Sequence, residues 1–158
     1  MTASARRESG FTYLVMLFAV ATAGALVASG SVVWQQDAQR QREKELLRIG
    51  SELRQAIGLY YHRSPGSVQR YPEKLEDLLR DDRHLSLQRY LRRIYRDPMT
   101  GTQEWGVVTA PQGGIMGVYS RSDAAPVKSG GFDERNAAFT ATARYSEWKF
   151  VYTPPSTQ

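Results

Sequence analysis

The chain has 158 residues and a formal net charge of +5, from 21 basic and 16 acidic residues. The two signs are interspersed, and no lysine- and arginine-rich block with interleaved aromatic residues occurs, so nucleic acid is not an expected partner. The sequence contains no cysteine, which excludes disulfide bonds and thiolate chemistry. The length is that of a single domain.

The N-terminal region changes character at residue 11. Residues 1–10 are polar and include Arg6 and Arg7, whereas no charged residue occurs from Phe11 to Gln36. About 20 predominantly apolar residues are needed to cross the hydrocarbon core of a bilayer, so this run predicts a transmembrane helix. The arginines before it favour a cytoplasmic N-terminus, with the rest of the chain on the other side of the membrane.

The helical signal continues beyond Asp37, where charged residues begin. Residues 37–61 contain no proline, and their apolar residues recur at steps of three and four: Leu46, Ile49, Leu53, Ile57 and Tyr60 or Tyr61. We therefore expect one helix from Phe11 to about Tyr61, with an apolar first half and an amphipathic second half. Gly24, Gly30, Gly50 and Gly58 are the positions at which we expect a bend or local unwinding.

The remaining residues predict two short helices followed by a small sheet. The helices are expected over residues 71–79 and 86–95, and strands over 105–110, 115–120 and 145–152. Pro111-Gln112-Gly113-Gly114 predicts a hairpin between the first two strands. In the third strand, Trp148, Phe150 and Tyr152 alternate with Glu147, Lys149 and Val151. We therefore expect these three aromatic residues to share the face toward the long helix and Tyr145 to lie on the other face.

These elements predict an α+β fold, in which a long N-terminal helix packs on a small C-terminal antiparallel β-sheet. Between the second and third strands we expect a polar loop, residues 121–142.

Two motifs carry a resemblance to a known family. Arg6-Arg7-Glu8-Ser9-Gly10, followed by Phe11-Thr12 and the uncharged run, resembles the class III signal of type IV pilins and type II secretion pseudopilins. The Asp97-Pro98-Met99-Thr100-Gly101 turn and the Gly-Gly-Ile-Met-Gly-Val-Tyr-Ser segment at 113–120 are similar to the major-pseudopilin group.

The resemblance implies a pilin-like fold with three parts: a prepilin leader over residues 1–10, a transmembrane and polymerisation helix over 11–36, and a periplasmic globular domain over 37–158. It also implies cleavage after Gly10 by a prepilin peptidase and N-methylation of Phe11. The chain departs from the family at Val15, where the family usually carries glutamate as the fifth residue of the mature protein. Whether this is a major subunit or a tip subunit therefore stays open.

The function implied is that of a structural subunit of a type II secretion pseudopilus, or of a related type IV pilus-like filament, which supports protein export. Its expected partners are other pilin-like subunits, as a homo- or hetero-oligomer, prepilin peptidase, and the inner-membrane assembly components of the secretion system. The expected location is the bacterial inner membrane, with the globular domain in the periplasm, and then the filament.

Other interpretations of the N-terminus are an ordinary secretory signal ending at Ala21-Thr22-Ala23, a twin-arginine signal and a plain single-pass anchor. The apolar run continues to Val33, which a released domain would not need, and a plain anchor leaves the Gly10-Phe11 junction unexplained. The main alternative function is a membrane-anchored periplasmic binding module that does not polymerise.

The sequence contains no arrangement typical of an active site, and we do not expect an enzyme. His62 and His84 lack metal-ligand spacing, and no phosphate-binding loop or nucleophile elbow occurs.

Calcium is the one cofactor that the resemblance suggests, since major pseudopilins commonly bind it near their C-terminal strands. Asp123, Asp133 and Glu134 are oxygen donors in the 121–142 loop and are the candidate ligands. The alternative is that they are solvated loop charges that pair with Arg121 and Arg135.

Overall fold

The computed structural model describes residues 9–155, apart from the side chains of residues 9–10 and 23–35. Two compact units divide the chain, residues 1–39 and 40–158. The elements in chain order are α1 (Ser9–His62), the 3-10 helix η1 (Leu75–Leu78), β1 (Gly106–Thr109), β2 (Ile115–Tyr119), the 3-10 helices η2 (Glu134–Phe139) and η3 (Tyr145–Glu147), and β3 (Phe150–Val151).

Helix α1 confirms the predicted long helix. It contains 54 residues and is unbroken at all four glycines, so the predicted local unwinding at one of them was wrong. Within the described part of the chain, no helix has an apolar stretch long enough to cross a membrane. The predicted span over residues 11–36 includes residues 23–35, whose side chains lie outside the described part.

The amphipathic second half of α1 supplies one side of the core. Leu46, Ile49, Leu53, Ile57 and Tyr60, the predicted apolar stripe, are all buried. They pack in one cluster with residues of the sheet and of the loops, among them Val118, Tyr145, Trp148 and Phe150. Burying a side chain of this size contributes roughly 1.5–3 kcal/mol, so the stripe is a principal source of the domain's stability.

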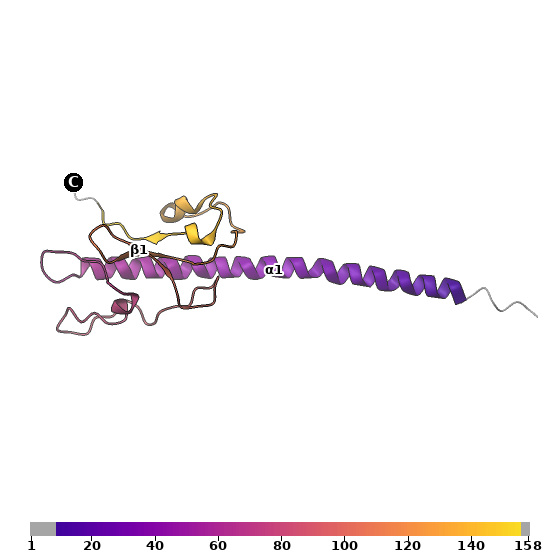
Figure 1. The fold of residues 1–158 in the computed structure, drawn as a ribbon, viewed down its shortest axis with the longest axis horizontal. Coiled ribbons are helices and arrows are strands. Elements are labelled where there is room, and N and C mark those ends of the chain that lie inside the picture. Colours follow the sequence, from indigo (N-terminus) through magenta and orange to yellow (C-terminus); the bar gives the residue numbers. More distant parts are fainter. Residues whose placement is uncertain (1–8, 156–158) are drawn as a thin grey trace, which may run out of the picture. The chain divides into compact units, whose positions relative to one another are not determined.

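The sheet has three antiparallel strands in the order β1-β2-β3 and lies along one side of α1 (Figure 1). The predicted hairpin is confirmed: Val107 pairs with Val118, and the turn contains Gly113 and Gly114, both with positive φ. Positive φ is accessible to glycine at little cost. The fold is therefore α+β, with a small antiparallel sheet and a long helix.

The third strand is much shorter than predicted. Residues Tyr145–Glu147 form η3, and only Phe150 and Val151 form β3. Tyr145 was expected on the face away from the helix, but it is fully buried, because the 3-10 turn breaks the alternation and directs its hydroxyl to Glu43. Phe150 and Tyr152 do face α1 as predicted, against Gly50 and Gly58.

Of the two short helices predicted before the sheet, only part of the first is present, and the second prediction was wrong. The first is reduced to η1, and the segment expected as a helix over 86–95 is irregular. Its backbone pairs across the chain instead: the amides of Tyr90 and Leu91 both donate to the carbonyl of Leu78, and Asp81 forms a bridge with Gln88. These bonds between segments replace the bonds that a helix would make within itself.

Candidate functional site

The predicted processing junction lies at the start of α1. Gly10 and Phe11 fall in its first turn, and the Phe11 side chain is 74% exposed. Arg6 and Arg7 of the predicted leader lie outside the described residues.

An exposed apolar section of α1 follows the junction. Its large apolar side chains are all more than half exposed: Phe11, Tyr13, Leu14, Val15, Met16, Leu17, Phe18 and Val20. The Thr22 hydroxyl donates to the Phe18 and Ala19 carbonyls, at 2.8 and 3.0 Å, so the helix itself satisfies it. A continuous exposed apolar surface of this kind is typical of a membrane or protein interaction site.

The three candidate calcium ligands do not form one site. Asp123 accepts a hydrogen bond from the Ser146 hydroxyl at 3.0 Å and pairs with Arg144 at 3.7 Å. Asp133 and Glu134 stand at the start of η2. Among the described residues, no group of three side chains of the metal-binding types lies together.

The alternative prediction was that these acids are solvated loop charges paired with Arg121 and Arg135. It was right that Asp123 is an exposed charge in an ion pair, but the partner is Arg144. Arg121 pairs with Glu104, at 3.2 Å, rather than with the loop acids.

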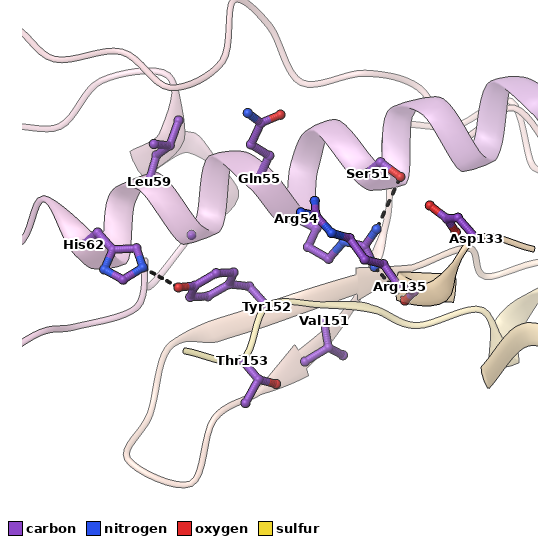
Figure 2. A pocket seen from close by; sticks show the side chains of 11 residues that line it. Ser51, Arg54, Gln55, Leu59, His62, Asp133, Arg135, Val151, Tyr152 and Thr153 are labelled. Carbon is purple, nitrogen blue, oxygen red and sulfur yellow. Dashed lines mark hydrogen bonds between the residues drawn. The ribbon is translucent and has the colours of Figure 1, made fainter. Parts of the chain in front are cut away.

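A groove of about 740 Å³ runs between α1, η2 and β3 (Figure 2). We call it the basic groove and define it by its lining: Ser51, Arg54, Gln55, Gly58, Leu59 and His62 of α1, Asp133 and Arg135 at η2, and Val151, Tyr152 and Thr153 at β3. At one end the Tyr152 hydroxyl and His62 Nε2 form a hydrogen bond. Gly58 leaves room for the Tyr152 ring to lie against α1, because a Cβ at this position would stand 2.7 Å from the ring.

The charge of the groove comes from two guanidinium groups. Arg54 donates to the backbone carbonyl of Arg135 and to the side-chain carbonyl of Asn136, both at 3.1 Å. Burial lowers the pKa of Arg54, the neighbouring Arg135 lowers it further, and Asp133 opposes both. Arginine still stays protonated at physiological pH, so two positive charges face one carboxylate in this groove.

Sequence reasoning missed Glu43, a buried carboxylate on α1. Its Oε1 accepts hydrogen bonds from the amides of Val127 and Lys128, at 2.6 and 3.1 Å, and from the Tyr145 hydroxyl at 2.8 Å. Glu43 therefore joins α1 to the 121–142 loop and to η3. The available signal was its position three residues before Leu46, on the same helical face as the apolar stripe.

A second buried acid, Asp81, holds the end of α1 through Arg83. The Arg83 guanidinium donates to both Asp81 carboxylate oxygens, at 2.8 Å each, and to the Tyr60 carbonyl at 2.9 Å. That carbonyl lies in the last turn of the helix, where carbonyls lack helical partners. His84 lies 3.5 Å from Asp81, so both histidines have polar neighbours within the domain.

No family model matches the chain, and comparisons with curated proteins and with solved structures found no match either. What can be proposed about function therefore rests on the residues and contacts described above.

Proposed function

We propose that this chain is a structural subunit of a type II secretion pseudopilus or of a related type IV pilus-like filament, with a pilin-like fold. The observation that carries the proposal is the exposed apolar section of α1, which belongs to the same helix as the buried stripe of the globular domain. One helix thus combines a surface that requires an apolar environment with a surface that forms the core of a folded domain.

The exposed apolar side chains of α1 require burial in an apolar environment. Eight large side chains between Phe11 and Val20 are exposed, and fully burying each would contribute roughly 1.5–3 kcal/mol. Lipid provides that burial before assembly, and the helices of neighbouring subunits provide it in a filament. Small residues such as Ala19 and Ala21 allow close helix contacts.

In this proposal the precursor is inserted in the bacterial inner membrane with its domain in the periplasm. Prepilin peptidase cleaves after Gly10 and Phe11 is methylated, and the assembly components of the secretion system then add the subunit to other pilin-like subunits. The resemblance of residues 6–12 to a class III signal supports this processing step.

The test of processing is Gly10→Val in the full chain, co-produced with a prepilin peptidase. The enzyme must accommodate the residue before the cleaved bond, so we expect the variant to stay full-length, while wild type loses residues 1–10 and gains one methyl group. Intact mass of the membrane-extracted protein measures both changes. Ser9→Val is the matched control and should be processed. Equal processing of the Gly10→Val variant and wild type, or an uncleaved wild type, would contradict the proposal.

The basic groove favours a second candidate, a membrane-anchored binding module that does not polymerise. A photocrosslinking amino acid in place of Phe18, on the exposed section of α1, reports which chains lie beside this helix. A filament subunit should crosslink to other copies of the chain or to other pilin-like subunits in the assembling cell, whereas a monomeric module should not.

A further inference from the structure

We propose that the basic groove of one subunit binds the acidic turn of a second copy, and that this contact sets the direction and register of assembly. The acidic turn is defined as residues 73–77, which lead into and include most of η1. The inference rests on the proposed function, because it assumes that copies of this chain assemble with one another.

The basic groove carries positive charge that its own residues leave unmatched. Within the described part of the chain, Arg54 donates to neutral acceptors, and the exposed Arg135 guanidinium has no ion pair. Asp133 is the single acid of the lining. A carboxylate that entered the groove would therefore meet a net positive site, with Arg135 free to pair with it.

The acidic turn carries negative charge that is likewise unpaired. Asp77 is occupied locally, because it accepts hydrogen bonds from the amides of Glu73 and Lys74 at 3.0 and 2.9 Å. Glu73 and Glu76 are exposed, and among the described residues their carboxylates have no hydrogen-bond or ion-pair partner. With three acids and Lys74, the turn has a net negative charge.

The turn does not occupy the groove of its own subunit. Tyr71, two residues before the turn, donates to the carbonyl of Tyr152 in the groove lining at 3.3 Å, but among the described residues no hydrogen bond or ion pair joins residues 73–77 to that lining. Pairing between copies joins unlike surfaces, and such a heterologous contact leaves one groove and one turn free at the two ends of every assembly. Repetition that does not close into a ring gives a filament.

Exposed ion pairs add little to affinity, since water and salt screen them. Their effect is to exclude wrong orientations and registers, in which like charges would meet. Burial of the apolar helices provides the affinity, and the groove and the turn select one arrangement among those that helix packing allows.

The test is a charge exchange in the full-length chain, produced in cells that assemble it, with filament quantity measured by sedimentation and electron microscopy. We expect Arg135→Glu and Glu76→Arg each to reduce filament quantity by about fivefold or more, and the double variant to restore most of it. Both residues are exposed, so circular dichroism should show unchanged folding. Arg89→Glu, an exposed arginine outside the groove, is the control and should assemble as wild type.

Crosslinking tests the contact itself. Cells that produce Leu59→Cys and Lys74→Cys subunits together should give disulfide-linked mixed dimers, because Leu59 lines the groove and Lys74 lies in the turn. Neither variant alone should give them. Normal filaments from Arg135→Glu, or Leu59→Cys linked to a different protein, would overturn this inference and leave the proposed function standing. An unprocessed wild type that forms no filaments would overturn both.

Discussion

Glu43, Asp81 and Asp97 are buried acids. Glu43 and Asp97 join segments that are distant in the sequence, and Asp81 does so through Arg83, which reaches the Tyr60 carbonyl. Asp97 accepts hydrogen bonds from the Met99 amide at 2.9 Å, the Thr100 hydroxyl at 3.1 Å and the Ser120 hydroxyl at 2.7 Å. A buried carboxylate is costly unless donors surround it, and all three are supplied with donors here. In a domain whose sheet has only three short strands, these acids fix loops that the sheet does not hold.

Asp81 makes the stability of the domain depend on pH. Burial opposes its ionisation, but the hydrogen bonds from Arg83 and Tyr90 outweigh burial and lower the pKa from 3.8 to about 2. The carboxyl binds a proton more weakly in the folded state than in the unfolded state. Its contribution, roughly 2 kcal/mol, is therefore complete above pH 4 and is lost as the pH falls from about 4 to about 2.

We accordingly expect the free energy of unfolding of wild type to fall between pH 4 and pH 2.5. Asp81→Asn should be less stable at pH 7 by roughly 2 kcal/mol and should show a shallower decline over that interval. Urea unfolding of the full chain in non-ionic detergent, followed by tryptophan fluorescence, measures both quantities. The control is Asp82→Asn, whose carboxylate pairs with Arg80 on the surface. Parallel pH profiles for Asp81→Asn and wild type would show that Asp81 does not cause the acid sensitivity.

At the scale of the element, Gly50 and Gly58 of α1 are contact positions. Helix propensity alone predicts that Gly50→Ala stabilises the helix by about 1 kcal/mol. In the folded domain, however, a Cβ at Gly50 would overlap the ring of Phe150, which is fully buried. Because a buried ring has little room to move, we expect Gly50→Ala to destabilise the domain by about 1–3 kcal/mol.

Gly58→Ala is the matched comparison, since its new Cβ would meet the half-exposed ring of Tyr152. That ring can turn outward, so the variant should cost less than Gly50→Ala and should loosen the hydrogen bond of Tyr152 with His62. Thermal unfolding followed by circular dichroism ranks the two. A Gly50→Ala variant more stable than wild type would mean that propensity, and not packing against β3, decides at this position.

The same elements show what the sequence could and could not predict. The apolar stripe from Leu46 to Tyr60 and the 106–119 hairpin were predictable, because periodicity and turn glycines are local signals. The irregular 86–95 segment was not, since its form depends on the Leu78 carbonyl, supplied by residues outside it. The basic groove could not be predicted from the sequence either, because Arg54, Arg135 and Tyr152 come together only when η2 and β3 lie on α1.

At the scale of the whole molecule, the core begins well inside α1. The first described residue of the hydrophobic cluster is Leu46, and Glu43 is three residues before it. The second compact unit, residues 40–158, thus contains all of the cluster. The exposed apolar section, Phe11–Val20, contributes nothing to this cluster, so its removal should not cost the domain stability.

A chain that begins at Asp37 should therefore be monomeric in water and should unfold cooperatively. A chain that begins at Arg63 lacks all of α1 and with it five buried apolar side chains of the stripe, Leu46, Ile49, Leu53, Ile57 and Tyr60. At roughly 1.5–3 kcal/mol each, their loss is comparable to the total stability of an ordinary domain, about 5–15 kcal/mol. The shorter chain should consequently fail to fold and should aggregate through the apolar face that α1 covers, which includes Phe150. Size-exclusion chromatography and thermal circular dichroism of the two chains separate these outcomes. If the chain from Arg63 is monomeric with a cooperative transition, the sheet and loops form a core without the helix, and the stripe is not what holds the domain together.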